Sequence, residues 1–123
     1  MLIAADVAIA LVALLHVYIL VLEMFFWCTS RGMAAFGTTP ELARATVTMA
    51  ANQGLYHGFL GAGLIVALVA GGPTTDVGLA FAVFFLLCVF VAGVYGGATV
   101  HRRILFVQSI PAAIGLVLVL LAR

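Results

Sequence analysis

The chain has 123 residues, of which 67% are hydrophobic and 7% charged, and its formal net charge is +1. A soluble domain of this size keeps much of its surface in water and cannot hide so many apolar side chains. The composition therefore predicts an integral membrane protein and excludes a soluble globular domain. With almost no net positive charge to attract nucleic-acid phosphates, we expect the lipid bilayer, and no nucleic acid, as a partner.

Four long apolar segments follow one another along the chain. We expect membrane spans over about residues 4–27, 50–70, 77–99 and 104–122, which together form one transmembrane domain over residues 1–123. No basic residue precedes the first segment, and it is too long for the core of a signal peptide, so we expect it to be retained. The predicted fold is an all-α integral membrane protein, a four-transmembrane-helix bundle.

The connections between the segments carry recognisable signals. Residues 28–40 are expected to form a polar connection. Thr38-Thr39-Pro40-Glu41 predicts the start of a helix that extends to Ala70, with a threonine cap and a proline in the first turn. Residues 71–76, with two glycines and a proline, are typical of a tight turn. Pro111 removes a backbone hydrogen bond and predicts a kink near residues 108–111.

The arginines set the expected orientation. Arg31, Arg44, Arg102 and Arg103 lie in or next to the first and third connections, whereas the opposite side has only Arg123. The positive-inside rule then places loops 1 and 3 in the cytoplasm and both termini on the outer side of the inner (plasma) membrane.

A histidine and a glutamate, His16 and Glu23, lie deep within the first apolar segment. Seven residues are close to two helical turns, so both side chains fall on one helix face, about 10 Å apart along the axis. An ionisable group at membrane depth costs about 2.5–3.5 kcal/mol on insertion scales, and such groups are functional candidates. The structural alternative is that Glu23 reaches toward the headgroups while His16 bonds a backbone carbonyl.

With this topology, polar side chains from all four segments fall into one layer in the cytoplasmic half of the membrane. The layer comprises Glu23, Gln53, His57, Tyr95, Thr99 and Gln108, and His16 lies deeper. The outer half is almost purely aliphatic. Because lipid offers no hydrogen-bond partners, a shared layer predicts contacts among these groups, with water or with a ligand.

Each polar residue also has a purely structural interpretation. Gln53 and His57 could form a helix–helix hydrogen bond, Tyr95 could anchor its helix at the interface, and Gln108 could satisfy the carbonyl that Pro111 frees. The two GxxxG pairs, Gly54/Gly58 and Gly93/Gly97, favour close helix contacts. Such contacts serve either packing within one chain or a homo-oligomer, which we expect here.

Four stretches carry a resemblance to a known family. They are His16-Val-Tyr-Ile-Leu-Val-Leu-Glu-Met-Phe-Phe-Trp27, Asn52-Gln-Gly-Leu-Tyr-His-Gly-Phe-Leu-Gly-Ala-Gly-Leu64, Ala92-Gly-Val-Tyr-Gly-Gly-Ala-Thr99 and Gln108-Ser-Ile-Pro-Ala112. In this order, across nearly the whole chain, they resemble the DUF1304 family of small bacterial membrane proteins. The resemblance implies no assigned function. In that family we expect an asparagine where this chain has His57, so a histidine-specific role there is not implied.

The residues favour a site for a small, largely apolar molecule with one polar end, and the chemistry suits an acid–base isomerase. Glu23 is the predicted proton carrier, with His57 or His16 as its partner, and Tyr95 and Gln53 are predicted orienting donors. The remaining predicted contacts to the molecule come from Trp27, Thr99 and Gln108.

Other functions remain open at this point. A small proton-coupled transporter would use Glu23 as a titrating group, and a non-catalytic accessory or assembly subunit would need no site. No HxxxH or HExxH motif is present, so no metal site is expected. A haem with His16 or His57 as its axial ligand stays an alternative.

Overall fold

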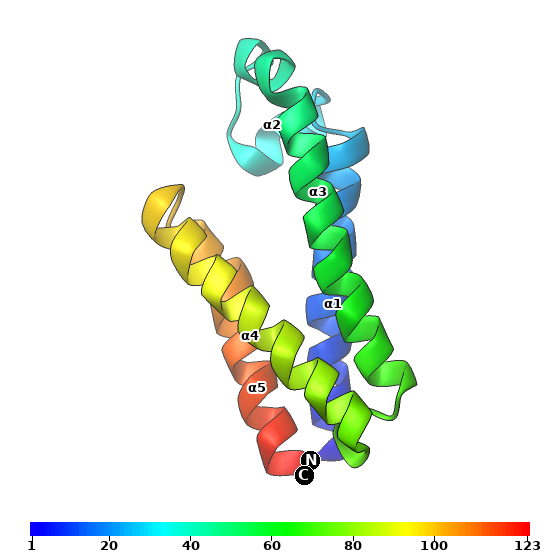
Figure 1. Ribbon diagram of the computed structural model, residues 1–123. Coiled ribbons are helices and arrows are strands. Elements are labelled where there is room, and N and C mark those ends of the chain that lie inside the picture. Colours follow the sequence, from blue (N-terminus) through cyan, green and yellow to red (C-terminus); the bar gives the residue numbers. More distant parts are fainter. The chain divides into compact units, whose positions relative to one another are not determined.

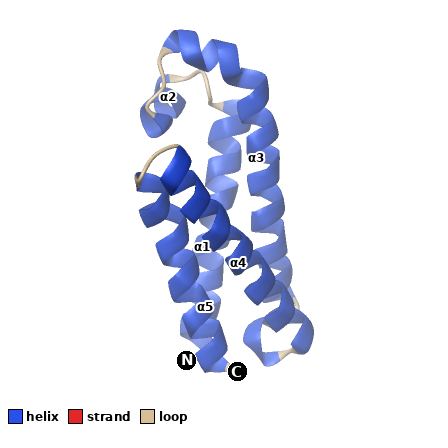
Figure 2. Ribbon diagram, turned by 60° about the vertical axis from the view of Figure 1, so that its left-hand side comes forward, coloured by secondary structure: helices blue, strands red, loops and turns tan.

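The protein is all-helical in a computed structural model that describes residues 1–123. The α-helices are α1 (Leu2–Phe25), α2 (Ser30–Phe36), α3 (Pro40–Val69), α4 (Asp76–Thr99) and α5 (Ile110–Ala122) (Figure 1). A 3₁₀ helix at Gly72–Thr74 and a π-helical segment at Leu105–Ser109 complete the elements. Short loops join the helices, and there are no strands (Figure 2). The all-α prediction is confirmed.

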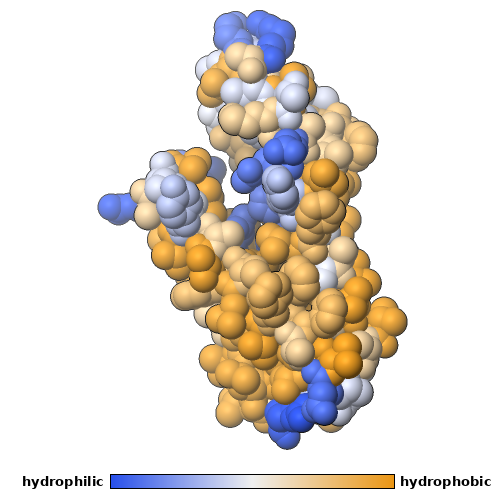
Figure 3. Space-filling model, in the orientation of Figure 1, coloured by the Kyte–Doolittle hydropathy of each residue, from blue (hydrophilic) through white to orange (hydrophobic).

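Three helical segments are long and apolar enough to cross a membrane: Leu2–Phe25, Asp76–Thr99 and Leu105–Ala122. Helix α3 has 30 residues but is not among them, since polar side chains in its first half lower its hydropathy. Large apolar side chains are exposed along the helices and cover most of the face shown in Figure 3. Water would disfavour such a surface, whereas lipid accommodates it. The chain is therefore an all-α protein of the membrane-spanning type.

Threonine caps fix the starts of two long helices. The Thr39 hydroxyl accepts a hydrogen bond from the Leu42 N–H at 3.2 Å, and α3 begins at Pro40, as the sequence predicts. The Thr75 hydroxyl accepts from the Gly78 N–H at 3.0 Å at the start of α4. Each cap satisfies an N–H group that the first helical turn leaves without a partner.

The tight turn between α3 and α4 depends on glycine. Gly71 and Gly72 have φ angles of 102° and 56°, in the left-handed region that other residues rarely adopt. A Cβ added at Gly72 would lie only 2.3 Å from Asp6 Oδ1 of α1. Both the backbone conformation and the approach of α1 therefore require glycine at this position.

The first connection differs from the prediction, because it contains the short helix α2 within the expected loop. The Thr29 hydroxyl accepts from the Gly32 N–H at 3.2 Å and starts the helix. Gly37, with φ 65°, ends it in a left-handed conformation. A seven-residue helix leaves little hydrophobic periodicity, so only these caps could have indicated it.

The chain divides into two compact units. Unit 1 comprises Met1–Leu14 and Leu60–Arg123, and unit 2 comprises Leu15–Phe59. The core of unit 1 draws on four helical segments, namely the first part of α1, the last part of α3, and α4 and α5. Its buried members are mostly small or β-branched: Ala5, Ile9, Val12, Ala13, Leu64, Ala67, Ala82, Leu86, Val89, Ala112 and Val119. Small side chains let the helices approach closely.

A π-helical segment precedes the last helix, close to where Pro111 predicts a kink, and the kink itself stays a prediction. Residues Leu105–Ser109 are π-helical, and the Ser109 hydroxyl donates a hydrogen bond to the Phe90 carbonyl of α4 at 3.1 Å. A Cβ added at Gly93 would lie 2.8 Å from the Ser109 backbone nitrogen. The absence of a side chain at Gly93 is therefore what lets the π-helical segment approach α4.

Candidate functional site

Three ionisable side chains of unit 2 gather at the contact between α1 and α3. Glu23 Oε2 of α1 lies 3.7 Å from His57 Nε2 of α3. The rings of His16 and His57 have centroids 5.4 Å apart and are tilted by 39°. All three residues are buried: Glu23 is 6% exposed, His57 is 9% exposed and His16 is 0% exposed. His57 thus lies against both His16 and Glu23 of α1, which are themselves about two turns apart.

Glycines bring the two helices together at this place. A Cβ added at Gly54 would lie 2.9 Å from Glu23 Cβ, and one added at Gly58 would lie 2.4 Å from Leu20 Cδ1. As the residue number rises along α3, the partner number falls along α1, so the two helices are antiparallel here. The GxxxG pair Gly54/Gly58 therefore packs α3 against α1 within one chain and positions His57 against Glu23.

The hydrogen-bonding capacity of the cluster is not used up within the protein. A separation of 3.7 Å suits an ion pair but is too long for a hydrogen bond. Glu23 Oε2 and His57 Nδ1 are buried and have no hydrogen-bond partner. Leaving a buried polar atom unsatisfied costs about 1–3 kcal/mol, so such atoms require an explanation. The side chains of His57 and Glu23 remain 11% and 7% exposed.

No group of three or more His, Cys, Asp or Glu side chains is placed to hold a metal ion. The imidazole rings of His16 and His57 are in direct contact. A flat macrocycle therefore has no space between them as they lie in this structure.

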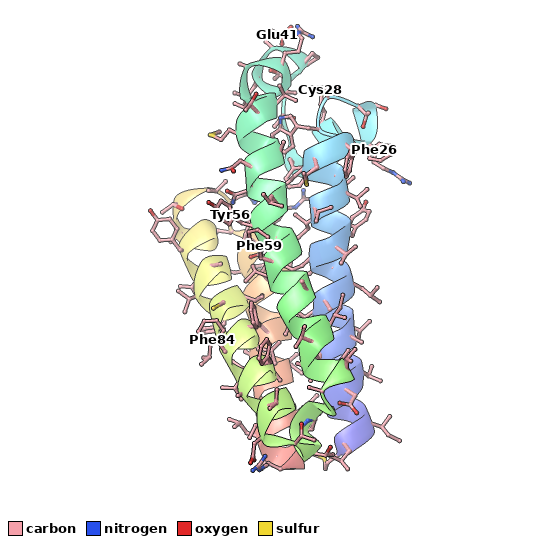
Figure 4. All side chains as sticks on the ribbon, turned by 45° about the vertical axis from the view of Figure 1, so that its right-hand side comes forward. Phe26, Cys28, Glu41, Tyr56, Phe59 and Phe84 are labelled. Atoms are coloured by element: carbon pink, nitrogen blue, oxygen red, sulfur yellow. The ribbon has the colours of Figure 1, made fainter.

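Trp27 has a clear structural role just beyond the end of α1. Its indole N–H donates to the Thr46 hydroxyl of α3 at 3.1 Å, and its ring packs on Phe36 at 4.9 Å between centroids. Phe26 and Cys28, its neighbours in the chain, are labelled in Figure 4. Thr46 was not a predicted partner, and no spacing in the sequence relates it to Trp27.

Gln53 lies one turn before His57 on α3 and is exposed. Asn52, its neighbour, is exposed as well. Tyr56 is also exposed, and its ring meets Phe59 edge-on, with centroids 5.9 Å apart (Figure 4). The surface of α3 beside the buried cluster therefore carries two carboxamides and a phenol.

The other predicted site residues, Tyr95, Thr99 and Gln108, belong to unit 1. Tyr95 is 72% exposed on α4, and the Thr99 hydroxyl donates to the Tyr95 carbonyl at 2.7 Å, a bond within the helix. Gln108 is buried in the π-helical segment, next to Gly93. Their participation in a site stays a prediction, as do the roles assigned to Trp27 and Gln53.

These features define an all-helical protein of the membrane-spanning type with a buried carboxyl–imidazole cluster. The chain belongs to the DUF1304 family, described as a protein of unknown function, which it matches over residues 10–120. It is similar to the uncharacterised protein YpaA of Lactococcus lactis subsp. lactis (strain IL1403), with 30% identity over 109 residues, 87% of this chain and 88% of that protein. No solved structure matches the chain. The matched range includes every predicted site residue.

Proposed function

We propose that Glu23, His57 and His16 form an acid–base site within the membrane. The site binds a small, largely apolar molecule by its polar end and moves a proton on it, which is the chemistry of an isomerase. The observation that carries the proposal is the buried approach of Glu23 Oε2 to His57 Nε2 at 3.7 Å, with Glu23 Oε2 and His57 Nδ1 lacking hydrogen-bond partners. Ionisable groups at membrane depth are rare and mark functional sites.

The two kinds of side chain supply complementary chemistry. A carboxylate can remove a proton from a carbon next to a carbonyl group, and an imidazolium or carboxylic acid can return a proton to another carbon. The proton count is unchanged, so the net result is an isomer of the bound molecule. His16 contacts His57 and can thereby influence the orientation of its ring. The exposed carboxamide of Gln53, one turn from His57, is suited to orient an oxygen of the molecule.

We also propose that α3 crosses the membrane as a fourth span within a single transmembrane domain. In unit 2, Gly54 and Gly58 of α3 pack against Glu23 and Leu20 of the apolar helix α1. Residues that pack side by side on antiparallel helices lie at similar depth, so this part of α3 shares the depth of α1. The polar residues in this part of α3 lower the mean hydropathy of the helix, but they belong to the proposed site. Four spans keep both termini on one side, and the arginine distribution favours the outer side, with loops 1 and 3 in the cytoplasm.

Both GxxxG pairs are used in contacts within the chain. Gly54 and Gly58 pack on α1, while Gly93 and Gly97 pack on the π-helical segment. A homo-oligomer therefore has to form through other faces of the helices.

Ligand retention tests the proposal. The full chain is purified in mild detergent as wild type, as Glu23→Gln and as Glu41→Gln, a control carboxylate that is exposed and pairs only with Arg44. Bound molecules are counted by native mass spectrometry, and organic extracts are identified by chromatography with mass detection. Wild type and the control should carry the same small apolar molecule, and Glu23→Gln should retain at least about tenfold less, because a hydrogen bond to a charged group contributes about 1.5–3 kcal/mol.

Two results would contradict the proposal. One is a wild-type protein without any bound small molecule, which would favour an accessory or assembly subunit. The other is equal retention by Glu23→Gln and wild type. His57→Gln serves as a second variant if Glu23→Gln does not yield folded protein, as judged by its elution from a sizing column.

A further inference from the structure

Two neighbouring arginines have no acidic partner in the connection that follows α4. Arg102 and Arg103 are exposed, and they take part in none of the ion pairs of the protein. By contrast, Arg44 pairs with Glu41 at 3.7 Å and Arg123 pairs with Asp76 at 2.5 Å. Two of the five arginines therefore form an uncompensated positive patch at one short loop.

The acidic residues of unit 1 cannot reach this patch. They are Asp6, which lies against Gly72, and Asp76, which begins α4 and pairs with Arg123. The 24 residues of α4 separate Asp76 from the arginines by about 36 Å at helical rise. Attraction over that distance is screened, because the Debye length is about 8 Å at physiological ionic strength.

The side chain of His101 adds a third donor at the same loop. Its Nδ1 accepts a hydrogen bond from the Arg103 backbone N–H at 3.1 Å. A neutral imidazole that accepts at Nδ1 carries its proton on Nε2, which is then available as a donor. The same bond holds His101 beside Arg103. Neither guanidinium donates a hydrogen bond within the protein, so the arginines do not serve as caps for the carbonyls at the end of α4.

Exposed apolar and aromatic side chains flank the patch on both sides in the chain. Tyr95 and Val100 precede it, and Phe106 follows it, all three largely exposed. Aromatic residues gather where the hydrocarbon of a bilayer meets the headgroups. A basic patch between such residues is therefore suited to contact lipid phosphates.

We infer that His101, Arg102 and Arg103 form a binding site for the phosphate headgroup of an anionic phospholipid. Arginine forks match phosphate oxygens with paired hydrogen bonds, and the histidine supplies a further donor. The flanking Tyr95, Val100 and Phe106 contact the upper acyl chains. The site holds lipid at the loop after α4 in unit 1 and shares no residue with the Glu23 cluster.

Lipid titration of the purified full chain tests this assignment. Native mass spectrometry compares the binding of anionic phosphatidylglycerol with the binding of zwitterionic phosphatidylcholine that has the same acyl chains. The variants are the double substitution Arg102→Gln/Arg103→Gln and the control Arg31→Gln, which removes an exposed arginine from α2. One basic residue near a lipid surface changes affinity about fivefold, so the double variant should lose about 25-fold of its preference for phosphatidylglycerol. The control should keep the wild-type preference.

Three outcomes would overturn the inference. An unchanged preference in the double variant would remove the arginines from lipid binding. An equal loss in Arg31→Gln would show a general charge effect without a site. Displacement of phosphatidylglycerol by low millimolar inorganic phosphate would show that the loop takes a soluble phosphate. Sedimentation or elution profiles that match the wild type verify that the variants are folded, which their exposed positions favour.

Discussion

The two glycines of one GxxxG pair, Gly54 and Gly58, should respond in opposite ways to alanine. A Cβ at Gly54 would meet Met24 Cγ at 2.8 Å, Glu23 Cβ at 2.9 Å and the Leu20 carbonyl oxygen at 3.2 Å. Backbone and Cβ atoms cannot move without moving α1, so relief requires the helices to separate. At Gly58 the close atoms belong only to the end of the Leu20 side chain, which can rotate away.

The magnitudes follow from two opposing effects. Alanine in place of glycine favours a helix by about 1 kcal/mol. Forced overpacking costs about 1–3 kcal/mol. Gly54→Ala should therefore be destabilising by up to about 2 kcal/mol, whereas Gly58→Ala should be neutral or stabilising by up to about 1 kcal/mol. Because Gly54 faces Glu23, its substitution should also disturb the approach of Glu23 to His57.

Thermal unfolding of the purified protein in detergent, followed by circular dichroism at 222 nm, measures the difference. A lower Tm for Gly54→Ala than for Gly58→Ala agrees with the packing described. Equal Tm values, or the reverse order, would refute the contact between α3 and α1 at these positions. Gly54→Ala should retain less ligand than the wild type, as Glu23→Gln does. Gly58→Ala should retain as much ligand as the wild type.

Three further substitutions test separate contacts by the same thermal measurement. Trp27→Phe removes the hydrogen bond to Thr46 and should lower the free energy of unfolding by about 0.5–1.5 kcal/mol. Thr46→Val should lower it little further in the double variant. If the losses of the two single variants add in full, the hydrogen bond is absent. Gly72→Ala should destabilise by about 1–3 kcal/mol, because its φ of 56° strains any other residue; an unchanged Tm would contradict the turn. Asp76→Asn should cost less than about 1 kcal/mol, since its ion pair with Arg123 is exposed, and a larger loss would show a buried role.

Much of the fold could be predicted from residue patterns whose physical effect is local. Thr39 and Pro40 identify the start of α3, and Gly71 and Gly72 identify the turn before α4, because caps and left-handed turns depend on a few neighbouring residues. The length of α2 is too small for periodicity to reveal it. The presence of three segments apolar enough to span a membrane follows from composition, whereas the fourth span depends on the packing of α3 and stays a proposal.

The candidate site was predictable only in part. A spacing of seven residues correctly places His16 and Glu23 on one face of α1, and the helix–helix contact at Gly54 and Gly58 brings His57 to them. The pairing of Trp27 with Thr46 could not be predicted, because it depends on how α1 and α3 align across a connection that contains α2. The rotation of each helix about its own axis could not be predicted either, because the hydrophobic pattern of a membrane helix is nearly uniform around that axis.

Glu23 and its histidine partners are proposed to move a proton on an apolar molecule. Solvent exchange measures this most directly. An apolar extract of membranes from the cells that make the protein is incubated in D₂O with the full chain. The sample is then returned to ordinary water, where deuterium on oxygen and nitrogen is lost. High-resolution mass spectrometry measures the deuterium that remains bound to carbon. With wild type, and with the Glu41→Gln control, one molecule should gain carbon-bound deuterium. General acid–base groups contribute about 10²–10⁴-fold to rate, so Glu23→Gln should slow the gain at least about 100-fold. Absence of carbon-bound deuterium with wild type, or an undiminished rate with Glu23→Gln, would contradict the claim.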